Sequence, residues 1–231
     1  MSFPPTGTTA DRTPREGSGY RQTARTTPAR SKERVSYDRE LVHSVLDEGY
    51  VCHLGYVREG APVVLPTLYA REGERLYLHG STGATAVLGA RGDGLAVCVT
   101  VTHVDGLVLA RSAFHHSVNY RSVVVHGTAH PVRDTAEKAR VLDLLVDHVV
   151  PGRAADCRPA DPKELAATGV LALDLAEVSV KVRAGGPNDD PEDLSLPHWA
   201  GVLPVRTVHG PPVPAGASAS APGYLTAYAR A

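Results

Sequence analysis

The chain has few cysteines, few aromatic residues and almost no excess of charge. Its three cysteines, Cys52, Cys98 and Cys157, are an odd number, and none belongs to a Cys-x-x-Cys pair. We therefore expect neither a disulfide framework nor a structural zinc site. The formal net charge of −1 argues against a general nucleic-acid-binding protein.

Long apolar segments are also missing. No apolar run approaches the about 18 residues that a membrane span requires. The N-terminus lacks the apolar core of a signal peptide. We expect a cytoplasmic protein without a membrane partner. Hydrophobic residues still make up 42% of the 231 residues, which is enough for a sizeable core.

The two ends of the chain differ in composition from its middle. Residues 1–34 are rich in Thr, Arg, Gly, Pro and Ser and contain few large apolar side chains. Such a segment buries too little surface to offset the entropy of ordering it. We predict a disordered tail there, with a binding arm as the alternative. Residues 210–231 are predicted to form a loose C-terminal tail. The folded domain is then expected over residues 35–209.

Strand patterns dominate the predicted domain. Short apolar runs separated by Gly-containing turns predict strands over 50–57, 62–70, 75–79, 95–102, 106–111, 120–132, 169–175 and 178–184. Asp105-Gly106 is interpreted as a tight turn between two of them. Helical spacing of apolar residues predicts helices over 38–48, 82–90 and 134–149. This pattern indicates a mainly β fold of the α+β type, a small barrel of antiparallel strands with flanking helices.

A first polar stretch, His79-Gly80-Ser81-Thr82-Gly83-Ala84-Thr85, follows a predicted strand and precedes a predicted helix. Its glycines permit close backbone approach, and its hydroxyl groups add donors for an anion such as phosphate. It lacks the Gly-Lys-Ser/Thr ending of a Walker loop and the glycine spacing of a Gly-x-Ser-x-Gly elbow. Simple capping of the helix by these hydroxyl groups is the alternative.

A second polar stretch precedes three consecutive valines, Val123 to Val125. It contains His115 and His116, followed by Asn119, Tyr120, Arg121 and Ser122. Side chains alternate between the faces of a strand, so two adjacent histidines on a regular strand cannot both bind one metal ion, and a metal site there would need distant partners. We expect no metal site. Arg121 could be a solvated charge at the barrel rim, and Tyr120 an aromatic at the edge of the core.

Two further residues stand out. Trp199, in Leu196-Pro197-His198-Trp199-Ala200-Gly201, is the only tryptophan of the chain. It could pack on the barrel or contact a planar cofactor. Lys181 lies in a strand whose alternate residues are valines, and it could be an exposed lysine of an edge strand.

In their order along residues 35–207, these stretches resemble the pyridoxamine 5′-phosphate oxidase-like flavoproteins, the FMN-binding split barrels. Arg121-Ser122-Val123 with Gly127 resembles the family's Arg-Gln-Val-x-x-x-Gly motif. Trp199-Ala200-Gly201 with Pro204 is similar to its Trp-Gly-Gly and following proline. The His-Gly at a strand end and Tyr-Arg-Ser-Val resemble the branch of 5-nitroimidazole resistance proteins.

The resemblance implies a split β-barrel, an FMN cofactor and a homodimer whose two chains build the flavin site. It implies that Arg121 neutralises the phosphate, while Asn119, Tyr120 and Ser122 bond the ring or ribityl chain. The other cofactor-binding residues that it implies are Val64, Leu65, Pro66, Thr67, His79, Gly80, Ser81, Thr82, Thr85, Lys181 and Trp199. No catalytic residue is assigned.

The chain also departs from the family pattern. The oxidases carry an Arg-Lys pair where Ser81-Thr82-Gly83-Ala84 stands here, and no Arg-Leu-His-like motif follows Pro204. Pyridoxamine-phosphate oxidation is therefore not expected. We expect an FMN-dependent oxidoreductase for a small molecule, such as a nitro compound or another electron-poor substrate. The alternatives are a non-catalytic flavin carrier and a heme protein on the same barrel, and some split barrels bind a deazaflavin.

Overall fold

The computed structural model describes residues 19–216, 220–226 and 228. Nine strands form one antiparallel sheet in the order β1-β8-β6-β7-β4-β3-β2-β5-β9. Their bounds are β1 Val35–Ser36, β2 Val51–Arg58, β3 Ala61–Glu72, β4 Arg75–Ser81, β5 Leu95–Leu109, β6 Ser117–Pro131, β7 Thr168–Asp174, β8 Glu177–Arg183 and β9 Gly201–Pro204.

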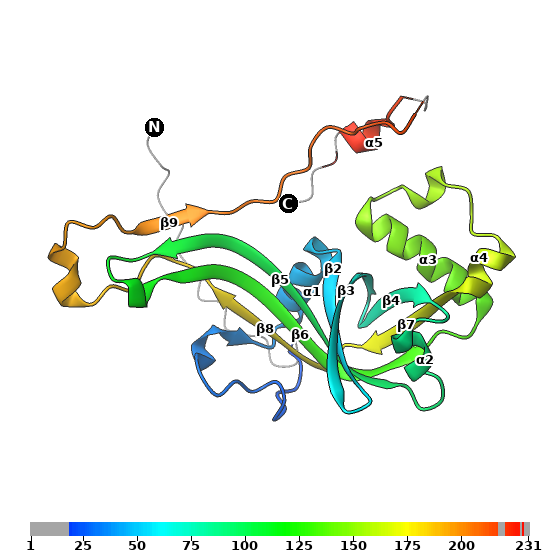
Figure 1. Cartoon of the computed structure of the whole chain (residues 1–231), viewed down its shortest axis with the longest axis horizontal. Coiled ribbons are helices and arrows are strands. Elements are labelled where there is room, and N and C mark those ends of the chain that lie inside the picture. The colour runs from blue at the N-terminus through cyan, green and yellow to red at the C-terminus, as the bar shows by residue number, and fades with distance from the viewer. Residues whose placement is uncertain (1–18, 217–219, 227, 229–231) are drawn as a thin grey trace.

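The sheet closes on itself because β5 pairs with β6 as well as with β2. Strands β6, β7, β4, β3, β2 and β5 thus form a six-stranded barrel, which Figure 1 shows at the centre of the molecule. One edge of the long β6 pairs first with β8 and then with β7, so β8 leaves the barrel as an extension. This is the split barrel that the family resemblance implied.

Alternation of side chains builds the core of the barrel. Along β2, Cys52, Leu54 and Tyr56 are buried while their neighbours face outward. The middle of β5 and β6 adds valines, among them Val99 and Val123. Glu59 and Gly60 both have positive φ, at 51° and 80°, as the two-residue turn between β2 and β3 requires. The Gly-containing turn expected between the strands predicted over 50–57 and 62–70 is therefore confirmed.

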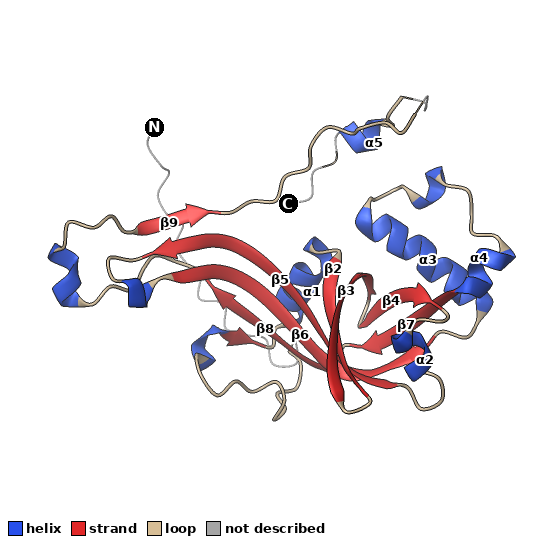
Figure 2. Cartoon of the chain, in the orientation of Figure 1, coloured by secondary structure: helices blue, strands red, loops and turns tan. Residues whose placement is uncertain are grey.

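Helices cover one end and one side of the barrel, as Figure 2 shows. Asp38 caps α1, Arg39–Glu48, by accepting a bond from the Leu41 N–H, and Asp134 caps α3, Thr135–Val149, in the same way. The shorter helices are α2 Thr85–Gly89, α4 Pro162–Ala167 and α5 Gly223–Thr226. The 3₁₀ turns are η1 Lys32–Arg34, η2 Ala113–His115, η3 Ala154–Asp156 and η4 Pro191–Ser195. Helix α4 was not predicted, although Asp161 and Glu164 form a capping box at its start.

The predicted turn at Asp105-Gly106 is wrong. Strand β5 runs without interruption from Leu95 to Leu109, and its register against β6 shifts between Val104 and Gly106. The extra residue, Asp105, is a β-bulge that redirects a side chain without ending the strand. Gly106 then lets β9 approach, because a Cβ there would lie 2.9 Å from the Val202 side chain.

The predicted disordered tail over 1–34 needs correction for its second half. Residues 1–18 lie outside the described residues, but Tyr20 is only 6% exposed and belongs to the core. Its hydroxyl donates to Glu74 at 2.8 Å, and the Arg39 guanidinium lies 4.4 Å from its ring centroid. Residues 19–34 thus pack against the barrel: Tyr20 anchors their start, Thr26 is also buried, and Arg25 pairs with Glu177 of β8.

The C-terminal segment is likewise anchored, where a loose tail was predicted over 210–231. It leaves β9, crosses above the barrel in Figure 1 and reaches the far end of α3. There Tyr224 donates to Asp156 at 2.6 Å, and the Tyr228 hydroxyl bonds to the Val149 carbonyl. Residues 217–219, 227 and 229–231 lie outside the described residues. No helix in the described part of the chain is long and apolar enough to cross a membrane.

Candidate functional site

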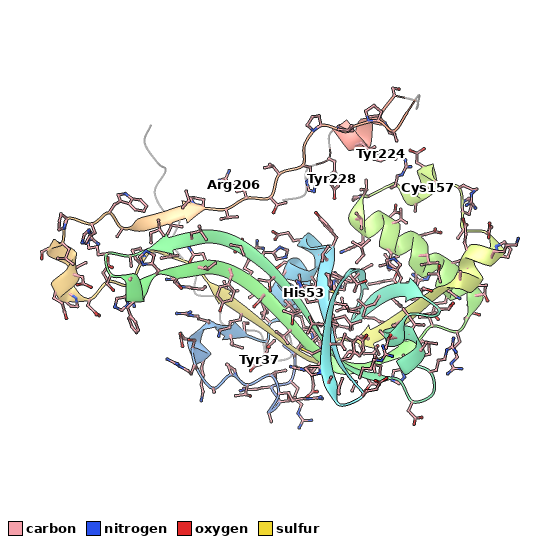
Figure 3. All side chains as sticks on the ribbon, viewed as in Figure 1. Tyr37, His53, Cys157, Arg206, Tyr224 and Tyr228 are labelled. Atoms are coloured by element: carbon pink, nitrogen blue, oxygen red, sulfur yellow. The ribbon has the colours of Figure 1, made fainter. Side chains whose placement is uncertain are left out.

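A cavity of about 740 Å³ lies between the barrel and the C-terminal segment. Its lining comes from the start of β2, from β5 around the bulge, from Arg121 of β6 and from residues 205–209, which we call the strap. Figure 3 labels Arg206 on the strap. The strap is held at its start by a bond from the Val205 N–H to the Asp105 carbonyl. This volume is typical of a site for a cofactor or a small substrate.

A charge cluster forms one wall of this cavity. Arg121 donates from Nη2 to Glu48 and Asp105 at 2.8 Å each, and from Nε to Asp105 at 3.0 Å; its Nη1 also bonds Glu48. The hydrogen bond from Arg121 holds the pKa of Glu48 below its usual value, and both carboxylates raise the pKa of Arg121. The expected contact of Arg121 with a cofactor phosphate stays a prediction. The structure shows an arginine already paired with two carboxylates.

His103 completes the wall. Its Nε2 donates to the Val45 carbonyl at 2.9 Å, and its Nδ1 lies 3.9 Å from Glu48. Sequence reasoning did not single out Glu48, His103 or Asp105 as site residues, because Asp105 was assigned to a turn. The bulge turns the Asp105 side chain toward Arg121. No local sequence pattern predicts this ion pair.

Six of the predicted cofactor-binding residues meet in a second, smaller pocket of about 180 Å³. They come from the middle of β3, the end of β4 and the start of α2, and are Leu65, Pro66, Thr67, His79, Gly80 and Thr85. Nδ1 of His79 is buried there without a partner among the described residues. Burial lowers the pKa of His79, which favours a neutral imidazole.

The hydroxyl groups beside this pocket also have local partners. Ser81 Oγ accepts the Gly83 N–H at 3.2 Å, and Thr85 Oγ1 accepts from Arg58 at 3.1 Å. Arg58 is the cation nearest to these hydroxyls in the hydrogen-bond network, and the sequence analysis did not name it. Thr82, beside Ser81, does not line either of the two cavities.

A third group of predicted residues shares the outer face of the sheet. Ser122 lies opposite Thr102 of β5 on one side and Lys181 of β8 on the other. Tyr120 is two residues away on the same face of β6. Val64 belongs to the exposed face of β3, beyond β2, and is 63% exposed. Tyr120, Ser122 and Lys181 are therefore brought together across β6 and β8, outside the small pocket, whereas Val64 lies in the row of His126, farther along the same face.

Asn119 and Trp199 lie apart from both cavities. Asn119 is 8% exposed, donates to the Gly185 carbonyl at 3.1 Å and accepts from Arg183, so its polar atoms are satisfied within the chain. Trp199 is 68% exposed, and its ring lies against Gly201. A Cβ on residue 201 would be 2.8 Å from that ring. Within a single chain, the predicted set is thus divided among several places.

Metal binding by protein side chains alone finds no support in the described residues. No group of three or more His, Cys, Asp or Glu side chains lies close enough together there to hold an ion. A cofactor that brings its own metal ligands is a different case, because it needs only one or two axial side chains.

Residues 38–182 match the family model described as pyridoxamine 5′-phosphate oxidase. The chain is similar to the flavocytochrome Anf3 from Azotobacter vinelandii, with 38% identity and a TM-score of 0.84 over 90% of this chain and 98% of that one. None of the curated proteins matches.

Two other solved structures are similar. The FAD and heme binding protein from Mycobacterium smegmatis is 38% identical, with a TM-score of 0.79 over 84% of this chain and 96% of that one. A Bacteroides thetaiotaomicron protein named for 5-nitroimidazole antibiotic resistance is 22% identical, with a TM-score of 0.54 over 64% and 86%. This last likeness shows the fold alone.

Proposed function

This chain belongs to the pyridoxamine 5′-phosphate oxidase family of split barrels, and on that premise we propose that it is a redox protein that binds a flavin and a heme. One observation carries the proposal: two structures, each 38% identical to this chain over most of both lengths, are named as a flavocytochrome and as an FAD and heme binding protein. A flavin would supply hydride or electron transfer, and a heme would supply one-electron chemistry.

The polar outer face of the sheet supports the flavin. Tyr120, Ser122 and Lys181 place a phenol, a hydroxyl and an ammonium group within two neighbouring strands. Such donors suit the carbonyl and nitrogen edge of an isoalloxazine ring. The hydroxyls and Arg58 beside the small pocket would bind the anionic end of the cofactor, FMN or FAD. These residues bind and orient the cofactor.

The reaction would be an oxidation or reduction of a small molecule, and an electron-poor compound such as a nitro compound suits a reduced flavin. Pyridoxamine 5′-phosphate is not the proposed substrate. Ser81-Thr82-Gly83-Ala84 offers no cation where the family's oxidases carry an Arg-Lys pair. The substrate's phosphate would also lack the Arg-Leu-His-like motif that holds it in those enzymes.

We further propose that the protein works as a homodimer. Phe114 is 89% exposed, Trp199 68% and Leu203 56%, and all three lie near the extended end of the β5–β6 hairpin. Large exposed apolar side chains favour burial against a partner. In a dimer, Trp199 of the second copy would also reach the flavin site of the first, which a single chain leaves without this ring. A clean monomer in sedimentation, measured with cofactor bound, would contradict this.

The test of the proposed function begins with the absorbance of the purified full-length protein. We expect flavin bands together with a Soret band. Release of the flavin followed by mass spectrometry separates FMN from FAD, and the pyridine hemochrome assay counts heme. Turnover with a reductant and an electron acceptor then separates an enzyme from a flavin carrier. A protein that contains neither cofactor and takes up neither on titration would refute the proposal.

A further inference from the structure

The outer face of the β2–β3 hairpin is apolar except for one histidine. On β2 this face carries Val51, His53, Gly55 and Val57, and the residues opposite them on β3 are Leu68, Pro66, Val64 and Pro62. Val57 is 65% exposed and Val64 63%. So much apolar surface in water is costly, and it indicates that a ligand or a partner covers the face.

His53 is central to this face and has no bonding partner in the described part of the chain. Its side chain is exposed, with Pro66 opposite it on β3 and Thr100 opposite it on β5. Neither of its ring nitrogens has a hydrogen bond or ion pair there. By contrast, His103 and His148 each bond a backbone carbonyl. The imidazole of His53 therefore keeps a nitrogen lone pair free for an incoming group.

The large cavity reaches the same face of β2 at Val51, although His53 itself is not part of its lining. Val51 lines this cavity and shares the outer face of β2 with His53, two residues away. Val104, Val205 and Val208 add apolar lining, and Arg206 adds a cation. Figure 3 labels His53 on β2 and Arg206 on the segment that crosses above the barrel. A flat apolar molecule with carboxylate groups matches this combination of surfaces.

We propose that His53 is an axial ligand of a heme that lies on the outer face of the β2–β3 hairpin and borders the large cavity. The porphyrin supplies four nitrogen ligands itself, so a single protein imidazole is enough to hold the iron. The apolar face would cover the macrocycle, and Arg206 would pair with a propionate. This proposal rests on the heme half of the proposed function and adds the residue that holds the metal.

Other histidines near the cavities fit this role less well. The Nε2 of His103 is occupied by the Val45 carbonyl, and its Nδ1 faces Glu48. His79 lines a pocket of about 180 Å³, which is smaller than the roughly 300 Å³ at which ligand sites begin. His209 lies on the strap with its ring against Tyr228, 4.7 Å between centroids. It is the strongest competitor and enters the test.

The experiment compares hemin binding by the full-length parent, His53→Gly, His53→Met and His209→Ala. In His53→Gly we expect hemin affinity to fall by about tenfold or more, on the scale by which a metal's protein environment alters its binding. Adding free imidazole should restore the parent's Soret band and electron paramagnetic resonance signal. His53→Met should bind with a different spectrum, because a thioether replaces the imidazole. His209→Ala should resemble the parent.

The outcomes separate the two proposals. If the parent binds flavin but never heme, the heme half of the proposed function fails, and the role of His53 fails with it. If the parent binds heme and His53→Gly keeps the same affinity and spectrum, only the role of His53 is overturned. If only His209→Ala loses hemin affinity, the axial ligand is His209 on the strap, and the role of His53 is overturned. Circular dichroism checks folding, which this exposed substitution should leave intact.

Discussion

Replacing Arg121 by alanine would test whether this arginine stabilises the fold or holds the cofactor. Its side chain is 28% exposed, and it bonds Glu48 and Asp105, which are 27% and 36% exposed. A charge-assisted hydrogen bond contributes on the order of 1.5–3 kcal/mol, whereas an exposed ion pair contributes less than about 1 kcal/mol. For this half-exposed cluster we expect a loss of about 2 kcal/mol, which in a domain of this size lowers Tm by about 4–8 °C.

The loss should depend on pH. Arg121 holds the pKa of Glu48 below 4.5, its usual value. A carboxyl group whose pKa is depressed in the folded state adds stability above its unfolded pKa, and this stability is lost as pH falls through the folded pKa. Without Arg121, burial and the charge of Asp105, which both raise the pKa of Glu48, would be opposed only by His103. The difference between parent and variant should therefore be largest near pH 7 and should shrink below 4.5.

Urea denaturation at pH 7 and at about pH 3.5 measures this difference. Arg140→Ala is the matched control, because Arg140 forms an exposed ion pair with Glu72 at 2.7 Å. Flavin affinity, read from fluorescence quenching, separates the two roles: a cofactor-binding arginine predicts about a tenfold or larger loss, and a structural one predicts little change. A stability loss no larger than that of Arg140→Ala, or one independent of pH, would refute the reasoning.

Three further predictions concern the anchored ends and the buried histidine. Deleting residues 1–34 should lower Tm, and Tyr20→Phe alone should cost about 1 kcal/mol because the bond to Glu74 is lost; unchanged denaturation curves would show that this segment does not pack. Tyr224→Phe should speed proteolysis within residues 206–216, since its bond to Asp156 anchors the segment, and equal cleavage rates would contradict the anchor. Because burial lowers the pKa of His79 below 6.5, the parent should lose stability as pH falls below 6.5. His79→Asn should lose less over that range, and parallel pH curves would speak against this.

Local patterns in the sequence were enough to predict most of the elements. The spacing of Val42, Val45 and Leu46 predicted α1, and Asp134 predicted the start of α3. These predictions succeeded because amphipathic periodicity and capping depend on residues within one or two turns. The family resemblance then supplied the split barrel, which the family match and the solved structures confirm.

The errors came where distant parts of the chain override local preference. Asp105-Gly106 has the composition of a turn, but β5 is held along its length by β2, β6 and β9, so the pair becomes a bulge inside a continuous strand. Tyr20 belongs to a segment of disordered composition, yet it is buried by contacts to Arg39 and Glu74, which follow much later in the chain. One anchored aromatic residue changes the state of a polar segment without changing its average composition.

The sequence by itself determined most of the strands, the main helices and the polar stretches that the family resemblance assigns to a cofactor. Only the tertiary structure decided which of those polar groups have partners. Arg121 meets Glu48 across 73 positions of the chain and Asp105 across 16, while His53 lies on an apolar face and has no partner among the residues that the structure describes. The physical reason is that the face of a side chain follows from alternation along one strand, whereas its neighbours follow from register and barrel closure. Register and barrel closure therefore decide whether a polar side chain is paired, as Arg121 is, or available to bind a cofactor, as we propose for His53.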